Sequence, residues 1–526
     1  MSTGSTDALF RLIQSLTKAE KRSFKLFVNR NSASIEELKF LKLFDFMDKT
    51  DAYSDEEALK KLSDIKRSQL SNIKAHLYKQ VLGSLRLQHS SHLPALEIRE
   101  AIDYSQLLHH KGFYMQALRQ LDKAKQLAHK HESIVLQLEI AELEKSIESQ
   151  YITRSLPTRA EQLTSETQAL ENRLGLSVKF SNLSLQLYAL YVKVGFVRNE
   201  KDYLFVTDFF KTRLPAYNYN KLGFEEKLHL YNAQVWHHYI TQDFLRCYRY
   251  ATKWVDCFME VPNAKEQYYE MYLKGLHYLQ NSVFNLRNAN RLENVVDLLE
   301  EETRTSYIMD QENTKMLRDL YWITGKINIY YLTGTFEDGV TFVDEVEDFI
   351  TKYEGQLDQH RIMVLYYKIA CIYFGSGDNK MTIRYLNQVI QMKEVSLRED
   401  IQCFARILNL IAHFELGNDD LIQYQIKSFI RFLSNMGDMH GVQREILSFL
   451  RQPAFVNEQA MLRGFKILHG KLVKLSQLPY EKRPFLYLDI ISWLEAKSQG
   501  RPVQSIIREK FLKEKATGEY HYFPND

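Results

Sequence analysis

The chain has 526 residues, of which 26% are charged, and its formal net charge at pH 7 is +3. So small a net charge excludes a nucleic-acid or membrane-surface role that rests on the charge of the whole chain. No apolar run reaches the about 18 residues that a membrane-spanning helix requires, and the first residues lack the pattern of a secretory signal. We therefore expect a cytoplasmic protein without membrane association.

The composition favours helix nearly throughout. The chain holds only 20 Gly and 9 Pro, the residues that most often interrupt helices, and it is rich in Leu, Lys, Glu and Gln, which have high helix propensity. The 32 Tyr and 30 Phe predict bulky packing between the helices. We expect an all-α fold with an N-terminal helical module, a superhelix of repeated helix pairs and an irregular helical C-terminal cap.

Residues 1–92 are predicted to form a helical module of their own. Capping-box spacing marks three helix starts, at Thr17 with Glu20, Ser34 with Glu37, and Ser54 with Glu57. The long helix that follows, at about 66–88, has an apolar stripe formed by Leu70, Ile73, Leu77, Val81 and Leu85. The break at Ser90–Pro94 predicts the boundary with the next region.

The helix at about 66–88 also carries a basic face. Residues 1–90 hold 16 Lys and Arg against 11 Asp and Glu. The cations that lie away from the apolar stripe are Lys66, Arg67, Lys74, Lys79 and Arg86. A solvated helix face is the simplest interpretation. Helix-turn-helix DNA binding is the alternative, although Ser63-Asp64-Ile65 replaces the usual glycine turn. In that case Lys66, Arg67, Lys74 and Lys79 would contact an anionic partner.

Residues 95–435 are predicted to repeat one unit: an amphipathic helix, a tight polar break and a second amphipathic helix. Gly112 supplies the first break, and a longer helix at about 132–152 follows. We expect Thr158 with Glu161 to cap the next helix and Gly175 to end it. Further breaks recur at intervals of 40–48 residues, at Gln242-Asp243-Phe244, Asn290, Gly334-Thr335-Phe336, Gly377-Asp378-Asn379 and Gly417-Asn418-Asp419. A repeated helix pair is typical of a solenoid.

From residue 436 the pattern becomes less regular. We expect residues 436–516 to form a helical C-terminal cap, because the last repeat of a solenoid must have its apolar face covered. Residues 517–526 are expected to form a flexible tail.

The spacing of small and large residues within the pairs resembles the tetratricopeptide repeat. The best match is formed by Ala370, Tyr373, Gly377, Thr382, Leu386 and Val389, and its second half recurs at Gly112, Ala117, Leu121 and Ala124. The intervals of 40–48 residues exceed the about 34 residues of that family, and its early Trp and closing Pro are absent here. As a whole the chain also resembles uncharacterised bacterial helical-repeat proteins, a likeness that implies no function.

The tetratricopeptide resemblance implies a binding function. In that family the first helix of each pair lines a concave groove that holds an extended peptide or a partner helix. The matching positions are our candidate partner-binding residues: Asn232, Tyr239, Gln280, Arg287, Asn328, Tyr331, Tyr367 and Phe374. Their amides suit a peptide backbone, the arginine suits a carboxylate, and the aromatic rings give rigid contact area. Ordinary packing between helices is the alternative for each of them.

Motifs for catalysis, cofactors and metals are missing from the sequence. The four cysteines lie in apolar stretches and are expected to be buried and reduced; they are Cys247, Cys257, Cys371 and Cys403. The histidine pairs point in different directions on a helix and do not converge on one metal; they are His109-His110, His129 with His131, and His237-His238. We expect no enzyme activity, no cofactor and no metal.

The leading hypothesis is a non-enzymatic scaffold or adaptor that binds a protein or peptide in its concave groove. Two alternatives remain. One is a peptide-responsive regulator whose N-terminal module binds DNA, similar to regulators of bacterial signalling. The other is a self-assembling structural protein. Neither the identity of the partner nor the oligomeric state follows from the sequence.

Overall fold

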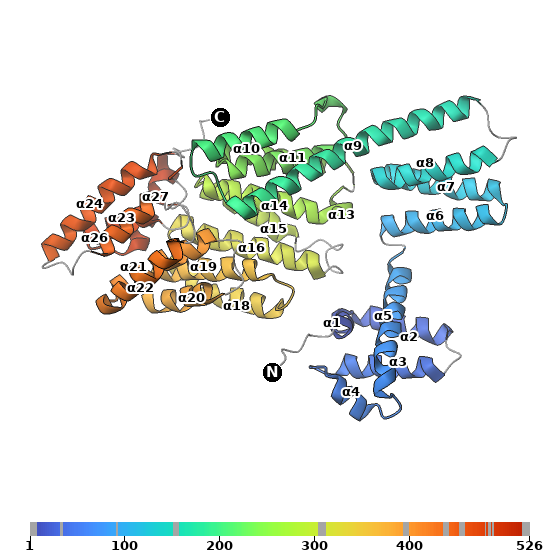
Figure 1. Ribbon diagram of the computed structural model, residues 1–526, viewed down its shortest axis with the longest axis horizontal. Helices are drawn as coiled ribbons and strands as arrows, with labels where there is room; N and C mark the ends of the chain where they lie inside the picture. Colours follow the sequence, from blue (N-terminus) through green and yellow to red (C-terminus); the bar gives the residue numbers. More distant parts are fainter. Residues whose placement is uncertain are drawn as a thin grey trace. The chain divides into compact units, whose positions relative to one another are not determined.

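A computed structural model describes residues 8–31, 35–90, 93–150, 157–262, 264–302, 312–392, 399–434, 441–451, 458–478, 480–481, 485 and 489–517. Within these ranges every regular element is a helix, so the predicted all-α class is confirmed there (Figure 1). The chain divides into two compact units, residues 1–174 and residues 175–526. The boundaries predicted at residues 92 and 435 stay predictions.

The helices nearest the N-terminus share a separate apolar core. They are α1 (Ala8–Ser15), α2 (Lys18–Asn31), α3 (Ile35–Lys49), α4 (Asp55–Lys61) and α5 (Arg67–His89). Phe44, Met47, Leu77 and Val81 are fully buried in this core. The capping box before α2 is confirmed, because Thr17 and Glu20 each accept a hydrogen bond from the other's backbone N–H, at 2.7 and 3.2 Å.

The other two predicted caps have different outcomes. Ser54 caps α4, since its hydroxyl oxygen lies 3.2 Å from the backbone N–H of Glu57. Ser34 lies outside the described residues, as do residues 518–526 of the predicted tail.

The next helix pair turns at Gly112, as the sequence predicts. Helices α6 (Pro94–His110) and α7 (Tyr114–Lys130) pack against each other, and Gly112 has the positive φ of 79° that favours glycine. Ala117 and Ala124 are fully buried, as close helix packing requires. Helix α8 (Ile134–Gln150) then packs on α7.

The predicted start and end of the following helix are wrong. Helix α9 runs from Pro157 to Val194, so Thr158 lies inside it and Gly175 does not end it. Proline is well suited to the first helical position, where its missing N–H costs nothing. One glycine in a helix costs only about 1 kcal/mol, and the buried side chains of Leu170 and Phe180 on either side of Gly175 favour continuation.

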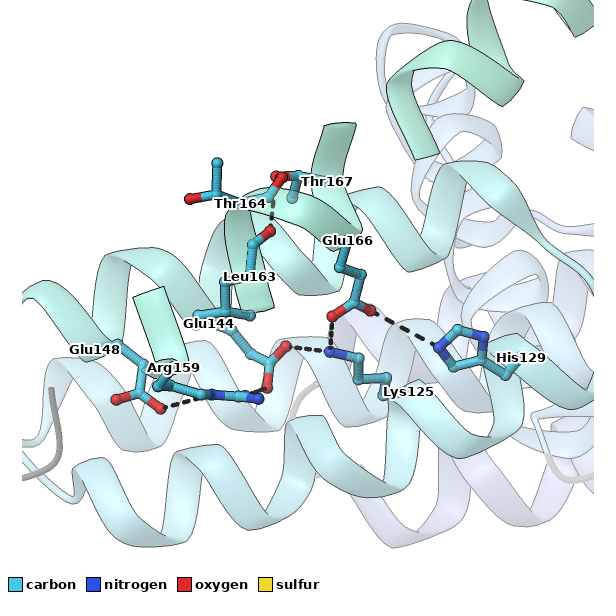
Figure 2. A network of polar contacts seen from close by, with 9 residues as sticks. All are labelled: Lys125, His129, Glu144, Glu148, Arg159, Leu163, Thr164, Glu166 and Thr167. Carbon is cyan, nitrogen blue, oxygen red and sulfur yellow. Dashed lines mark hydrogen bonds and ion pairs between the residues drawn. The ribbon is translucent and has the colours of Figure 1, made fainter. Parts of the chain in front are cut away.

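An ion-pair network links α7, α8 and the first turns of α9 (Figure 2). The ammonium of Lys125 lies 2.7 Å from a carboxylate oxygen of Glu144 and 2.7 Å from one of Glu166. Arg159 binds the other oxygen of Glu144 at 2.7 Å and lies 3.6 Å from Glu148. Each buried charge in this network therefore has an opposite charge beside it.

Helices of residues 175–526 pack in sequential pairs. The first members are α11 (Phe224–Ile240), α14 (Tyr269–Asn285), α16 (Glu312–Thr333), α19 (Gln359–Ser376) and α21 (Glu399–Glu415); we call them the first helices. Each contacts the helix after it, in turn α12 (Phe244–Glu260), α15 (Ala289–Glu301), α17 (Phe336–Thr341), α20 (Asn379–Gln391) and α22 (Asp419–Ser434). First helices also contact one another: α14 with α16, α16 with α19, and α19 with α21.

Three of the predicted breaks between these helices use glycine in the left-handed region. The φ angles of Gly334, Gly377 and Gly417 are 70°, 92° and 69°. The break predicted at Asn290 is wrong by three residues, because the chain turns at Arg287, where φ is 56°. Asn288 then caps α15 by accepting from the backbone N–H of Arg291 at 3.0 Å, which leaves Asn290 inside the helix.

The remaining helices connect or follow the pairs. They are α10 (Glu200–Arg213), the short 3₁₀ turn η1 (Tyr219–Lys221), α13 (Ala264–Gln267), α18 (Val343–Lys352), α23 (Gly441–Leu450), α24 (Glu458–Ser476), α26 (Ile490–Gln499) and α27 (Val503–Thr517).

The C-terminal helices fold back onto the middle of the chain. Helix α27 contacts both α16 and α19. Asp489, just before α26, lies 3.4 Å from the guanidinium of Arg287, and its backbone N–H donates to the hydroxyl of Tyr331 at 2.7 Å. The indole N–H of Trp493 donates to Glu415 at 2.6 Å. Residues 489–517 are therefore packed against first helices that lie far away in the sequence, 78 residues in the case of Trp493 and Glu415.

Candidate ligand-binding cavity

Successive first helices line one cavity in residues 175–526. Its volume is about 570 Å³, within the roughly 300–1,000 Å³ typical of ligand sites. Side chains from the second half of α9 and from α11, α14, α16 and α19 form most of its lining, and α21 contributes Ile401. We call it the aromatic cavity.

One wall of the aromatic cavity, formed by α9 and α11, consists largely of aromatic rings. The ring of Trp236 lies 5.3 Å from that of Tyr191 and 5.8 Å from that of Tyr239. On its other side the same indole is 5.5 Å from the ring of Tyr278 on α14. These edge-to-face and tilted contacts hold the rings rigidly. The wall therefore presents a preformed apolar surface to the cavity.

The opposite part of the cavity carries positive charge. Lys274 lies on α14, and Arg361 and Lys368 lie on α19. None of the described residues that line the cavity is Asp or Glu. Arg361 pairs with Asp358 at 3.2 Å, an exposed residue at the start of α19.

The two lysines have only neutral partners among the described residues. Lys368 donates a hydrogen bond to the side-chain oxygen of Asn328 and lies 5.3 Å from the centre of the Phe284 ring. Lys274 lies 6.0 Å from the centre of the Tyr278 ring. Burial lowers the pKa of Lys368 to about 8 and also lowers the pKa of Lys274. Both shifts have the sign expected for an ammonium group that loses water without gaining a carboxylate.

His277 lies among these cations. Its ring stacks on that of Tyr321 with 4.2 Å between centroids. Burial, together with the charges of Arg361, Lys274 and Lys368, lowers its pKa to about 3. At neutral pH the imidazole is therefore uncharged.

Two buried asparagine amides in the cavity lining have unused hydrogen-bonding atoms. Asn232 is 5% exposed; its amide nitrogen donates to Ser184 at 3.3 Å, and its side-chain oxygen has no partner among the described residues. Asn328 is 1% exposed; its oxygen accepts from Lys368, and its amide nitrogen has no partner in the same part of the chain. Buried polar atoms usually have partners. Each of these two atoms has less than 1 Å² of exposed surface, so a ligand in the cavity pairs with it only after the amide turns toward the cavity.

The predicted groove positions fall into two groups. Those that line the aromatic cavity are Asn232, Tyr239, Asn328, Tyr331 and Tyr367. The other three are placed elsewhere: Gln280 is fully buried and donates to the backbone oxygen of Tyr321 at 3.1 Å, Arg287 pairs with Asp489, and Phe374 is buried in the apolar core. The role of all eight in partner binding stays a prediction.

Sequence reasoning missed the two lysines and the ring of Trp236. A signal for Lys368 exists in the sequence, because it is the one charge in the apolar segment IMVLYYKIACIYF. A lone charge within an apolar helix has to reach either solvent or a polar cavity. No comparable signal marks Trp236, since a buried aromatic ring on a helix usually belongs to the core.

The basic face of α5 is largely exposed, and some of its cations are paired with carboxylates. Lys66, Arg67 and Lys79 are exposed. Lys74 pairs with Asp55 at 3.0 Å and lies 5.0 Å from the centre of the Tyr53 ring. Arg86 pairs with Asp103 at 3.0 Å. Part of this basic face is therefore neutralised by carboxylates of the chain itself.

Searches for other sites in the described residues give negative results. No group of three or more His, Cys, Asp or Glu side chains is arranged to hold a metal ion there. Within the same residues, none of the helices has the length and apolar character needed to cross a membrane. All four cysteines are buried, and none of them forms a disulfide among the described residues. No family model matches the chain, and no curated protein has significant sequence similarity to it.

Proposed function

We propose that the chain is a non-enzymatic scaffold or adaptor that binds a segment of a protein or peptide in the aromatic cavity. In this proposal the first helices form the concave face of a tetratricopeptide-like superhelix. The observation that carries it is the preformed aromatic wall of the cavity, whose lining also includes the buried amides of Asn232 and Asn328.

The two free atoms are complementary to a polypeptide backbone. The oxygen of Asn232 is an acceptor for a backbone N–H, and the amide nitrogen of Asn328 is a donor for a backbone carbonyl. A peptide offers both groups at every residue except proline. Satisfying both atoms removes the cost of two buried unpaired polar groups, about 1–3 kcal/mol each.

The aromatic wall supports the same function. Trp and Tyr are enriched at binding surfaces because they give a large contact area and lose little conformational freedom. In the cavity Trp236 is already fixed between Tyr191 and Tyr278. When a side chain of the bound segment packs against this wall, little conformational entropy is lost in ordering the rings of the wall.

The ionisation of the cavity groups favours binding over catalysis. Burial raises the pKa of the Cys371 thiol, which lines the cavity, to about 12. A thiol with this pKa is a poor nucleophile at pH 7. His277, with a pKa of about 3, is a weak general base at the same pH.

The test is a cavity-blocking substitution with a matched control on the same helix. Leu185 lines the cavity and is 64% exposed, so Leu185→Trp adds bulk there without disturbing the core. Val178 is 45% exposed on α9 and does not line the cavity, so Val178→Trp is the control. Each tagged protein is used to capture partners from native lysate, and its melting temperature is recorded.

We expect one or a few proteins to be captured by the wild-type chain and by Val178→Trp but lost with Leu185→Trp, while all three melt alike. If Leu185→Trp captures the same proteins in the same amounts, the cavity is not the binding site and the proposal is wrong.

A further inference from the structure

Charge is distributed unevenly along the aromatic cavity. All its lysine and arginine side chains come from α14 and α19, and none comes from α9, α11 or α12. The side chains from those three helices include the rings of Tyr191, Trp236 and Phe244. The cavity therefore has its cations on α14 and α19 and an uncharged aromatic wall on α9 and α11.

The three cations of the cavity lining all act electrostatically on one ring. Lys368 of α19 lies over the ring of Phe284 on α14. His277 is within electrostatic reach of Lys274, Arg361 and Lys368. A single anionic group placed beside His277 would therefore interact with all three charges.

Elsewhere in residues 175–526, some partly buried cations have carboxylate partners, whereas Arg406 has the side-chain oxygen of Gln402 and the ring of Phe432. Lys265 lies 3.1 Å from Glu302, and Arg287 lies 3.4 Å from Asp489. Lys274 and Lys368 lack such a partner among the described residues and have rings and one amide oxygen instead. A buried charge without a counter-charge is costly. An anionic ligand would compensate these two lysines.

We propose that the segment bound in the cavity is acidic and apolar: an Asp or Glu side chain lies between Lys274 and Lys368, and an apolar or aromatic side chain packs against the Tyr191–Trp236 wall. This inference rests on the proposed function. In a polypeptide the side chains that carry negative charge are the carboxylates of Asp and Glu. A segment that is charged throughout would not pack against the aromatic wall of the cavity, because its charges would lose water there. The arrangement also fixes the direction of the segment, with its acidic residue toward α14 and α19.

The experiment measures fluorescence polarisation of the full-length chain with three pools of labelled six-residue peptides. All peptides have a C-terminal amide and carry the dye on the N-terminus. Each pool contains one Phe and randomised neutral positions, and the pools differ only in one further residue, which is Asp, Asn or Lys. A fourth pool with Asn and a free C-terminal carboxylate separates a side-chain acid from a chain end.

We expect the Asp pool to bind at least about tenfold more tightly than the Asn pool, as a charge-assisted hydrogen bond implies. Lys274→Met and Lys368→Met should each remove most of this preference. Lys326→Met is the control, because Lys326 lies on α16 outside the cavity lining and near Glu300. Lys326→Met should leave the preference for the Asp pool over the Asn pool unchanged.

The possible failures have different meanings. Equal binding of the Asp and Asn pools that Leu185→Trp abolishes overturns the acidic assignment and leaves the proposed function standing. Tighter binding of the free-carboxylate pool than of the Asp pool overturns the side-chain assignment. Absence of binding by every pool overturns both this inference and a peptide-binding function. The comparison of pools uses the wild-type chain, so it does not depend on any variant folding.

Discussion

Lys125 and Lys368 are both partly buried lysines between packed helices, but their surroundings are opposite. Lys125 lies 2.7 Å from each of two carboxylates, whereas Lys368 has an amide oxygen and a ring. Burial would lower the pKa of Lys125, yet Glu144 and Glu166 raise it above the ordinary value. For Lys368 burial lowers the pKa to about 8. The first environment stabilises a charge, and the second gives it no counter-charge among the described residues.

This contrast separates charges that are paired within the chain from charges that lack a counter-charge. In the ion-pair network of α7–α9 both signs are supplied by the chain (Figure 2). The described residues that line the aromatic cavity supply only the positive sign. A buried ion pair is costly to break because its remaining partner is left uncompensated, whereas removal of an unpaired charge removes a cost. The same substitution, Lys to Met, should therefore have opposite effects in the two regions.

The largest effect is expected for Lys125→Met. It leaves Glu144, of which 1% of the side chain is exposed, with only Arg159 and should lower the stability of residues 1–174 by about 3 kcal/mol. All four tryptophans lie after residue 174, so hydrogen exchange of α7 and α8 is the appropriate measurement. Lys123→Met, at an exposed position of the same helix, is the control. An unchanged exchange rate would contradict the structural role of the network.

A smaller effect is expected for His277→Phe, which keeps the stack on Tyr321. In the folded chain burial holds the pKa of His277 at about 3, whereas in the unfolded chain it is about 6.5. The unfolded state therefore binds more protons below pH 6.5, and stability is lost as the pH falls. At pH 5 the substitution should recover about 2 kcal/mol of this loss. Urea unfolding followed by tryptophan fluorescence at pH 7 and 5 measures it.

For Lys368→Met we expect a gain in stability of about 1 kcal/mol at pH 7, because an uncompensated buried charge is removed. The folded pKa of about 8 lies below the ordinary value of 10.5, so the wild type becomes more stable as the pH rises through this interval. The advantage of the variant should therefore shrink between pH 8 and 10. Urea unfolding followed by tryptophan fluorescence measures this difference in stability between variant and wild type at each pH. A variant that is less stable at pH 7 would show that the ammonium is compensated after all.

The smallest effect is expected for Lys74→Met on the N-terminal module. Its partner Asp55 is 59% exposed in its side chain, and surface ion pairs contribute about 0.2–1 kcal/mol. The melting temperature monitored by circular dichroism should shift by only a few degrees. If Lys74→Met lowered stability as much as Lys125→Met, the exposure of an ion pair would not determine how much the pair contributes to stability.

Local features of this fold could be predicted from the sequence, because their causes are local. The helix starts at Thr17 and Ser54 depend on a side chain three residues from the N–H that it caps. The turns at Gly112, Gly334, Gly377 and Gly417 need a positive φ that glycine adopts without strain. The continuation of α9 through Gly175 was missed because contacts along the whole helix, rather than one residue, decide it.

For the candidate site, the sequence by itself determines which side of each first helix carries polar and aromatic residues. The tetratricopeptide resemblance selected eight positions, and five of them line one cavity: Asn232, Tyr239, Asn328, Tyr331 and Tyr367. Only the tertiary structure decided that Arg287 is taken by Asp489, 202 residues away, and that Lys274 and Lys368 meet no carboxylate among the described residues. Helical periodicity fixes the direction of a side chain, but its partner depends on which distant helices pack beside it.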